Sequence, residues 1–213
     1  MDSPEEARNY DAMDHSAVNL RFVADFLAFH GPCRGGEILD VGTGPGQIPI
    51  ALCLADPAAR VVGVDLARHM LDLAAQNVEA AGLAGRIRLQ LADAKRLDGD
   101  EGLFEAVLSN SIVHHIPDPA PALAEMARSV APGGTLFIRD LFRPGSAYEV
   151  DLLVELYNSL ESAEARDLFR DSLNASLTLA EIRSIVAGLG YDPAGVKMTS
   201  DRHWTWAWRR PPA

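Results

Sequence analysis

The amino-acid sequence predicts an α/β fold in which helices cover both faces of a parallel sheet. From Glu37 onward, short apolar runs alternate with longer segments of helical spacing, which is the pattern that strand–helix–strand units produce. A glycine-rich turn, residues 42–46, follows the first apolar run. The chain has 213 residues, 48% hydrophobic and 23% charged, so one globular domain is expected and disorder, collagen-like repeats and coiled coil are excluded as its main architecture.

The first 30 residues are expected to hold an amphipathic helix outside the sheet, from about Ser16 to Phe29. Val18, Phe22 and Phe26 recur there at near-helical spacing. Strands are expected at about residues 38–41, 61–64, 87–91, 106–109 and 135–138. Helices are expected at about residues 47–55, 67–81 and 120–130, and residues 132–134 are expected to form a turn before the fifth strand.

After Pro144 the pattern changes to two expected helices, over residues 148–160 and 179–189. Thr178 and Glu181 have the spacing of a capping box at the start of the second. Residues 196–199 and 203–208 are expected to form a terminal hairpin. Its alternating tryptophans are more typical of a buried sheet face than of a stacking platform for a ligand.

The charge of the chain argues against two classes of partner. Its formal net charge of -11 repels a phosphate backbone and an anionic lipid surface, so neither nucleic acid nor membrane is an expected partner. A cationic or neutral small molecule suits this field better. The partner expected is therefore a small molecule, and a homodimer is left open.

The cysteines and the terminal segments predict a soluble cytoplasmic protein. Cys33 and Cys53 are too few and too far apart for a disulfide framework or a CxxC site, so reduced thiols and no metal centre are expected. The acidic residues 1–8 do not resemble a signal peptide, and the apolar stretch 48–55 is too short to span a bilayer.

The turn after the first strand reads Asp40-Val41-Gly42-Thr43-Gly44-Pro45-Gly46. Glycines in such a turn let the backbone bend tightly and approach a ligand. A dinucleotide fingerprint would place its third glycine at position 47, where this chain has Gln47. Asp40 suits a cationic amino group and would repel a pyrophosphate. A tight strand-to-helix connection without a ligand is the alternative interpretation.

Carboxylates also follow the second and third strands. Asp65 ends the second strand at a position from which a carboxylate can accept hydrogen bonds from both ribose hydroxyls. The alternative is that Asp65 caps the helix expected from Ala67. Asp93 and Ala94 follow the third strand and could bind the amino group and ring nitrogen of an adenine, although by themselves they would pass for a plain loop.

Five blocks of sequence, in this order, resemble the class I S-adenosylmethionine-dependent methyltransferases. They are residues 38–46, 64–66, 92–94, 104–117 and 132–136, within a stretch from about Glu37 to Pro144. The resemblance implies a Rossmann-like three-layer sandwich with a seven-stranded, mostly parallel sheet whose last strand is antiparallel. It implies a single methyltransferase domain over residues 1–213, with a helical N-terminal lid segment (1–30), a cofactor-binding core (37–144) and a part with the C-terminal helices and closing hairpin (145–213).

The resemblance also implies which residues bind S-adenosylmethionine and its product S-adenosylhomocysteine. The implied cofactor contacts are Asp40, Gly42, Thr43, Gly44 and Gly46 at the methionine end, Asp65 at the ribose, Leu66 and Met70 flanking the adenine, Asp93 and Ala94 at its edge, and the Asn110 backbone. Residues 110–117 are most similar to the small-molecule branch. They lack the Asn/Asp-Pro-Pro-Tyr tetrapeptide by which many enzymes that methylate amide or base nitrogens are recognised, which argues against DNA bases and protein glutamine as substrates.

Three groups of residues are candidates for contact with the methyl acceptor. His114 and His115 follow the fourth strand, and a neutral imidazole can act as a base; the alternative is that one packs under the cofactor and the other caps the next turn. Arg139 and Arg143 follow the fifth strand and would bind an anionic substrate or form an internal pair with Asp140. Tyr10 belongs to the segment that resembles a lid and is a candidate substrate contact. The acceptor atom is not identified.

Two other functions remain open. A nicotinamide-dependent oxidoreductase has the same kind of fold, but Gln47 and Asp40 disfavour it. A protein that binds the adenosyl cofactor without catalysis, as a sensor or an assembly partner, is compatible with all the residues above.

Overall fold

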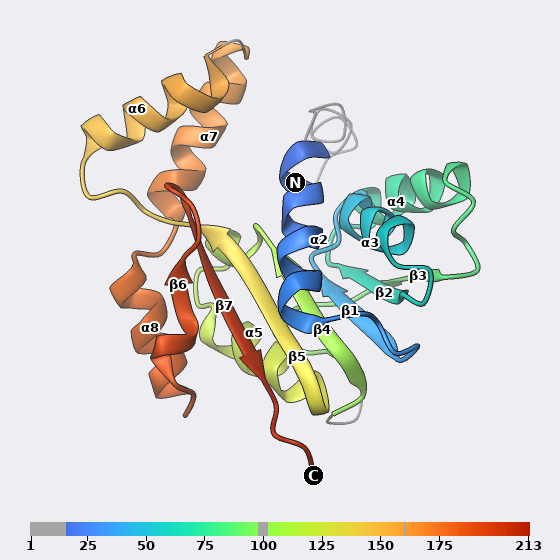
Figure 1. Cartoon of the computed structure of the whole chain (residues 1–213). Helices are drawn as coiled ribbons and strands as arrows, with labels where there is room; N and C mark the ends of the chain where they lie inside the picture. Colours follow the sequence, from blue (N-terminus) through green and yellow to red (C-terminus); the bar gives the residue numbers. More distant parts are fainter. Residues whose placement is uncertain (1–15, 98–101, 160) are drawn as a thin grey trace. The chain divides into compact units, whose positions relative to one another are not determined.

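The computed structural model describes residues 16–97, 102–159 and 161–213, and the chain divides into two compact units (Figure 1). The first unit comprises the described residues up to Asn110 together with Pro121–Ile138 and Ala207–Ala213. The second comprises Ser111–Ala120 and Arg139–Trp206. The predicted domain limits at residues 37 and 144 stay a prediction.

The strands form one seven-stranded sheet in the order β3-β2-β1-β4-β5-β7-β6. Their bounds are β1 Glu37–Val41, β2 Arg60–Asp65, β3 Ile87–Leu91, β4 Phe104–Asn110, β5 Val130–Leu141, β6 Val196–Met198 and β7 His203–Arg209. β1 pairs in parallel with β2 and β4, β2 pairs in parallel with β3, and β6 and β7 pair antiparallel. The predicted fold class is confirmed.

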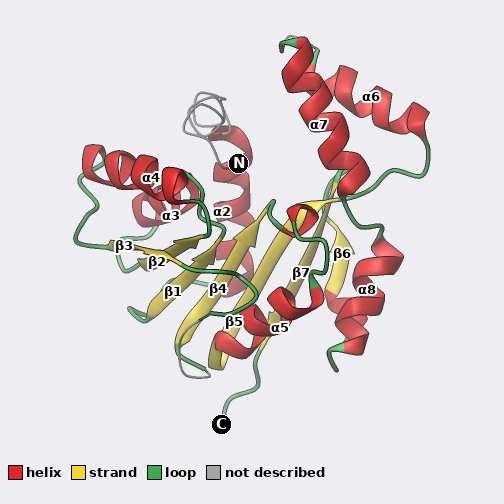
Figure 2. Ribbon diagram, turned by 180° about the vertical axis from the view of Figure 1, so that it is seen from behind, coloured by secondary structure: helices red, strands yellow, loops and turns green. Residues whose placement is uncertain are grey.

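The helices of the first unit lie on both faces of its strands. They are α2 Ser16–His30, α3 Gln47–Ala55, α4 Arg68–Ala80 and α5 Ala120–Ser129. Figures 1 and 2 show α2 on one face and α5 on the other. Phe22 and Phe26 of α2 are fully buried and contact Phe137 of β5 edge-on, with ring centroids 5.4 and 5.9 Å apart. The amphipathic helix predicted near the N-terminus therefore packs on the sheet.

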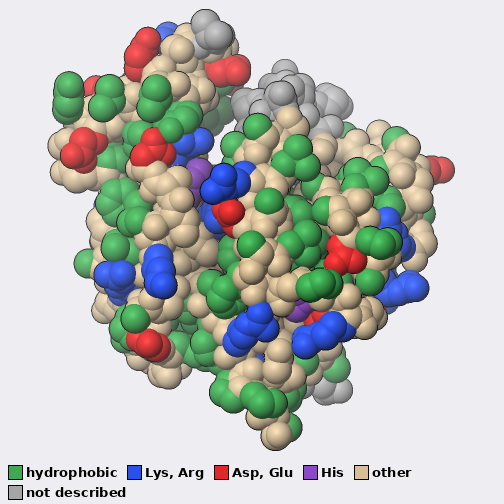
Figure 3. Space-filling model, viewed as in Figure 1, with side chains coloured by type: hydrophobic (Ala, Val, Ile, Leu, Met, Phe, Trp, Pro, Cys, Tyr) green, Lys and Arg blue, Asp and Glu red, His purple; other side chains and the backbone are tan. Residues whose placement is uncertain are grey.

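The second unit holds three further helices, α6 Ala147–Asn158, α7 Ala163–Ala175 and α8 Leu179–Gly188. α6 packs on α7 through a core that includes Val150, Leu153 and Leu173. The capping box of Thr178 and Glu181 is confirmed at the start of α8. Tyr148, Leu152 and Leu156 recur every four residues on α6 and remain exposed, and Figure 3 shows the apolar surface over this helix.

Two predictions about local structure were wrong. α7 was not expected, because its sequence is mostly polar and only Ala165 and Leu173 are buried in it; Ser162, whose hydroxyl accepts from the Ala165 N–H, is the local signal for its start. Residues 132–134 belong to β5 and do not form a turn before it. Gly133 donates to the Arg210 carbonyl and Gly134 accepts from the Arg210 N–H, so this segment is extended by pairing with the C-terminal residues.

No helix among the described residues is both long and apolar enough to cross a bilayer.

Candidate functional site

The glycine-rich turn after β1 is held in place by β2. The N–H groups of Gly42 and Thr43 both donate to the Val64 carbonyl, at 2.8 and 2.9 Å. Gly44 and Gly46 have φ angles of +53° and +81°, which residues with a side chain rarely adopt, and Gly46 is the N-cap of α3. The shape of the turn is therefore set by the chain itself before any ligand binds.

Asp40 lies at the end of β1 with an oxygen that the described residues leave unsatisfied. Its side chain is fully buried, and Oδ2 makes no hydrogen bond within the part of the chain that is described. Burial raises the pKa of Asp40 to about 7, the nearby Thr43 hydroxyl opposes this rise and Asp65 adds to it. Thr43 Oγ1 is also buried. Although it lies near Asp40, it makes no hydrogen bond that meets the geometric criteria among the described residues. Such groups are costly unless a ligand or water satisfies them.

A third unsatisfied oxygen lies at the end of the neighbouring strand. Asn110 Oδ1 is buried and unpaired within the described residues. β4 lies beside β1 with Ser109 opposite Val41, and the Ser109 hydroxyl donates to the Val41 carbonyl at 2.9 Å. Asp40, Thr43 and Asn110 therefore surround two adjacent strand ends and offer acceptor atoms to a ligand that carries N–H donors or positive charge.

Asp65, at the end of β2, joins the turn to the next helix. Its Oδ2 accepts from the Gly44 N–H and its Oδ1 from the Ala67 N–H, both at 2.8 Å. The second bond closes a turn just before α4, whose N-cap is Ala67 without a side-chain cap, so Asp65 is not the helix cap that the sequence left as the alternative. A carboxylate has about four acceptor sites, so these two bonds leave capacity for ribose hydroxyls.

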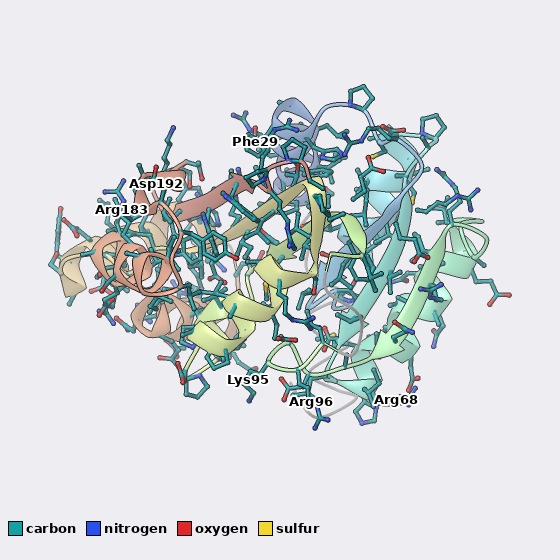
Figure 4. The ribbon with its side chains drawn as sticks, turned by 90° about the horizontal axis from the view of Figure 1, so that it is seen from below. Phe29, Arg68, Lys95, Arg96, Arg183 and Asp192 are labelled. Atoms are coloured by element: carbon teal, nitrogen blue, oxygen red, sulfur yellow. The ribbon has the colours of Figure 1, made fainter. Side chains whose placement is uncertain are left out.

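The residues predicted around the adenine occupy different environments. Leu66 is 68% exposed beside Asp65, whereas Met70 is buried in α4. Asp93 Oδ1 accepts from the Lys95 N–H at 2.9 Å, so the turn with Asp93 and Ala94 is internally bonded. Figure 4 marks Lys95 and Arg96, which follow Asp93 in this turn.

The residues of the first unit fit S-adenosylmethionine. The buried carboxyl of Asp40 and the oxygens of Thr43 and Asn110 suit a cationic methionine end, and Asp65 suits a ribose. The space beside Gly44 is open, since a Cβ atom built there would meet no described atom within 4 Å. A pyrophosphate does not fit, because its charge would meet that of Asp40.

A histidine–aspartate pair lies within the second unit. His114 Nδ1 lies 2.6 Å from Asp140 Oδ1, and the two side chains are only 4% and 1% exposed. His114 is in the short η1 helix, Val113–His115, and Asp140 is near the end of β5. The His115 ring lies against the His114 ring with centroids 4.0 Å apart. His115 is exposed to solvent as a residue, but partial desolvation of its ring and the neighbouring His114 lower the pKa of His115.

The segment that leads to this pair contains a strained residue. Ser111 has a φ of +59°, and among the described residues it is the only one other than glycine with a positive φ. Its N–H donates to the Arg139 carbonyl at 2.9 Å. Non-glycine residues persist in this conformation where the surrounding structure holds them, and such residues cluster at functional sites.

The predicted substrate residues are engaged in contacts of their own. Arg139 is buried and its Nε donates to Thr205 Oγ1 at 3.0 Å. Arg143 pairs with Glu181 at 2.5 Å, so an internal partner exists for it, although this partner is not Asp140. Tyr10 lies outside the described residues. The roles of Arg139, Arg143 and Tyr10 stay predictions.

The sequence did not single out Asp140 as the partner of His114. The two residues are 26 positions apart in the sequence. Asp140 lies between Arg139 and Arg143, which were closer candidates for an ion pair with it. The available signal was its place at the carboxyl end of a strand, the edge at which α/β proteins gather their functional groups.

One protein-family model matches part of the chain. Residues 38–134 match the model of a methyltransferase domain. The match covers the turn after β1, Asp65, Asp93 and Asn110.

Two curated relatives have methyltransferase names. Methyltransferase GfsG of Streptomyces halstedii is 33% identical over 132 residues, which are 62% of this chain and 47% of that protein. The ubiquinone biosynthesis O-methyltransferase of Methylococcus capsulatus is 33% identical over 134 residues, 63% of this chain and 54% of its own length. The chain thus spans about half the length of these relatives.

A solved structure shares the fold over most of its length. The plantazolicin methyltransferase BpumL, in complex with S-adenosylhomocysteine, superposes with a TM-score of 0.76 at 16% sequence identity, covering 95% of this chain and 88% of that one. At this identity the similarity establishes the fold.

Proposed function

We propose that the chain is an S-adenosylmethionine-dependent methyltransferase and that it transfers the methyl group of this cofactor to a small-molecule acceptor. The names of the relatives support a small acceptor, since one of them acts in ubiquinone biosynthesis. The net charge of -11 supports an acceptor other than nucleic acid.

One observation carries the proposal. Asp40 Oδ2, Thr43 Oγ1 and Asn110 Oδ1 are buried and unsatisfied within the described residues, around two adjacent strand ends. Buried polar groups are normally hydrogen-bonded, so three such oxygens at or just beyond the ends of two paired strands support a ligand with donors and positive charge. The methionine end of the cofactor has both.

Asp40, Thr43 and Asn110, together with Asp65, form the proposed cofactor cradle. Its two carboxylates have distinct roles in binding. Asp40 would neutralise the cationic end of the cofactor, and its burial makes that interaction stronger than the same pair in water. Asp65 would hold the ribose while its bonds to Gly44 and Ala67 keep the turn in shape. When bound, the cofactor supplies an activated methyl carbon, so much of the rate would come from alignment of the acceptor.

The residues that follow β4 and β5 would serve the methyl acceptor. His114 and His115 would serve as the base where the acceptor must lose a proton. Arg139 and Arg143 would bind an anionic group of the acceptor, and Tyr10 with the N-terminal segment would cover the site. Only four positions along the chain separate Asn110 from His114, which supports a role for this segment near the reacting group.

The test is methyl transfer itself. The full chain is incubated with S-adenosylmethionine carrying a deuterated methyl group and with phenols, quinones, amines, thiols and carboxylates, and products are identified by mass spectrometry. A deuterated product and stoichiometric S-adenosylhomocysteine are expected. Cofactor binding without transfer to any class would favour the non-catalytic binding protein, and binding of NADH in its place would favour the oxidoreductase.

A further inference from the structure

We propose that the exposed side of α6 is a docking surface for a basic amphipathic helix of a partner protein. This surface, the α6 stripe, consists of Tyr148, Leu152 and Leu156. It lies wholly within the second unit. The inference concerns a protein partner and does not depend on the methyl transfer proposed above.

The α6 stripe leaves large apolar side chains in contact with solvent. Tyr148, Leu152 and Leu156 are 76%, 53% and 62% exposed. Because they recur every four residues, they form one row along the helix, and Figure 3 shows apolar side chains over α6. A single exposed leucine is ordinary on a protein surface, whereas a contiguous apolar row marks an interaction site.

A second side of α6 is also apolar, and the fold already covers it. Val150, Leu153 and Val154 are buried and share a core with Leu173 of α7. At about 100° per residue, these three side chains of α6 are centred roughly 150° around the helix from the α6 stripe. Rotation of α6 would therefore bury one apolar side only by exposing the other. A helix that is apolar on opposite sides is normally covered on both.

Carboxylates border the α6 stripe on both sides. In the same helical projection, Glu149 lies at one edge of the stripe, and Asp151 and Glu155 lie at the other. Asp151 is paired with Arg170 of α7. Glu155 is exposed and makes no hydrogen bond or ion pair within the part of the chain that the structure describes. Because α6 itself has no Lys, Arg or His, the borders of the stripe are negative.

This charge selects among the possible occupants of the stripe. Residues 147–175, which contain α6 and α7, hold seven carboxylates and two arginines. A second copy of the chain would bring the same carboxylates to the stripe, and like charges across an interface cost affinity. Helices that lie on membranes have Lys and Arg on their polar side, which α6 lacks, and anionic headgroups would be repelled. A helix with leucines flanked by lysines or arginines matches both the stripe and its borders.

The length of the α6 stripe sets the size of the partner segment. α6 rises by about 12 Å from Tyr148 to Leu156, so a helix of roughly three turns would cover the stripe. Amphipathic helices bind apolar surfaces in this way, through side chains at spacings of three and four residues. Such a contact buries less than the roughly 800 Å² per partner of a standard interface, so weak and reversible association is expected.

The first test titrates synthetic peptides of about 18 residues into the full chain and follows their fluorescence anisotropy. One peptide has leucines at i, i+4 and i+8 flanked by lysines, and two matched peptides have glutamine or glutamate in place of each lysine. The lysine peptide should bind saturably and more weakly as salt is added. The glutamate peptide should bind about tenfold more weakly or not at all, with the glutamine peptide between them. Equal affinity for the three peptides, or no binding of the lysine peptide, would overturn the inference.

The second test locates the bound peptide with two substitutions and a matched control for each. Leu152→Ser should weaken binding of the lysine peptide about tenfold, and Glu155→Lys about threefold or more. The controls are Leu54→Ser, at a leucine of α3 that is 69% exposed, and Glu79→Lys, at an exposed position of α4. Both controls should keep affinity within twofold of the unaltered chain. Equal losses in the controls, or no loss in the variants of α6, would overturn the inference.

The third test separates the α6 stripe from the fold and from the other occupants. Leu152→Ser should keep the thermal midpoint of the unaltered chain, whereas Leu153→Ser, at the buried neighbour, should lower it. An equal decrease in both variants would assign Leu152 to the fold and overturn the inference. Self-association that Leu152→Ser abolishes, measured by sedimentation, would identify a second copy as the occupant. Binding to phosphatidylcholine vesicles that requires Leu152 would identify a lipid surface, and either result would overturn the inference.

Discussion

The backbone N–H of Gly44 donates a 2.8 Å hydrogen bond to the side-chain Oδ2 of Asp65. This bond joins the turn after β1 to the end of β2, and the other oxygen of Asp65 holds the start of α4 through Ala67. One carboxylate thus organises the two segments that are proposed to bind opposite ends of the cofactor. Asp65 is expected to matter for the shape of the empty site as well as for binding.

Asp65→Asn should weaken binding of S-adenosylmethionine and S-adenosylhomocysteine about equally. The amide keeps one acceptor oxygen but presents an NH₂ group where the other N–H donates, so one bond is lost and a ribose acceptor with it. A loss of tenfold or more is expected, since hydrogen bonds to charged groups are worth about 1.5–3 kcal/mol. Calorimetric titration of both ligands measures it. Asp72→Asn, on the exposed side of α4, is the control, and an equal loss in that variant would point to a global effect.

Gly44→Ala and Gly82→Ala form a matched pair. Both glycines have positive φ, +53° and +68°, and a side chain at either would meet no described atom within 4 Å. Each variant should lose about 1 kcal/mol of unfolding free energy from backbone strain. Only Gly44→Ala should also lose cofactor affinity, because its methyl group would enter the proposed ligand space. Equal affinity in the two variants would contradict the placement of the ligand at this turn.

Cofactor affinity should rise with pH through the titration of Asp40. Burial holds the pKa of Asp40 at about 7, well above its ordinary value of 3.8. A cation bound beside it favours the ionised form, so binding releases a proton where the empty site is protonated. Affinity for S-adenosylmethionine should increase roughly tenfold between pH 6 and pH 8. Titrations in buffers of different ionisation enthalpy would detect the proton, and Asp40→Asn should show neither the pH dependence nor the proton release.

The same residue should cost stability in the absence of cofactor. Because the folded pKa is raised, the unfolded chain ionises first, and the penalty develops as pH rises from about 4 to about 7 and is full above that range. Asp40→Asn should therefore be more stable than the unaltered chain at pH 8, by up to roughly 4 kcal/mol, and should gain little at pH 4. Urea unfolding at the two pH values measures the gain. A variant that is less stable at pH 8 would show that Asp40 supports the empty fold.

Glu105 should make the stability of the first unit sensitive to acid. It accepts from the Arg34 and Gly36 N–H groups at 2.7 Å and from the buried His30 ring at 3.1 Å. Burial alone would raise the pKa of Glu105, but these bonds hold it below its ordinary value of 4.5. Its contribution is present above pH 4.5 and is lost as pH falls through the folded pKa.

Glu105→Gln should lower the unfolding free energy by about 2–3 kcal/mol at pH 7, because an amide cannot accept from both N–H groups and the ring. The difference from the unaltered chain should shrink as pH falls below about 4.5. Cofactor affinity should be unchanged, since this network is at the start of β4 and the proposed cradle at its end. A constant difference from pH 7 to pH 3 would contradict the role of the charge.

Arg139→Lys tests the proposed anionic subsite. The buried Arg139 guanidinium bonds Thr205, and lysine cannot reproduce its planar set of donors. Once an acceptor is identified, its KM should rise with little change in S-adenosylhomocysteine affinity. Loss of cofactor binding in parallel would assign Arg139 to the fold rather than to the acceptor.

The sequence predicted the local shape of the turn after β1, but it did not predict the partners of the residues that follow β4 and β5, for a physical reason. The glycine turn and the helix that starts at Gln47 depend on neighbouring residues, so a local pattern was enough. The bond between His114 and Asp140 depends on where two strands of the sheet end, which no local pattern reports. Pairing of Arg143 with Glu181, 38 positions away, was missed for the same reason.

Secondary structure was likewise predicted well where a local pattern of apolar residues is clear. Helices with an apolar stripe, such as α4 with buried Met70, Ala74 and Val78, were predicted closely. α7 buries few residues and was missed. β5 extends to Val130 because Gly133 and Gly134 pair with Arg210 near the end of the chain, a contact that overrides the usual role of a Pro-Gly-Gly segment as a turn.

The most direct measurement is a calorimetric titration of S-adenosylmethionine into the full chain at pH 8, with NADH titrated in parallel and both repeated on Asp40→Asn. We expect saturable one-to-one binding of S-adenosylmethionine, at least tenfold weaker binding to Asp40→Asn, and no binding of NADH. Binding of NADH with no heat from S-adenosylmethionine would contradict a cofactor site for S-adenosylmethionine at Asp40.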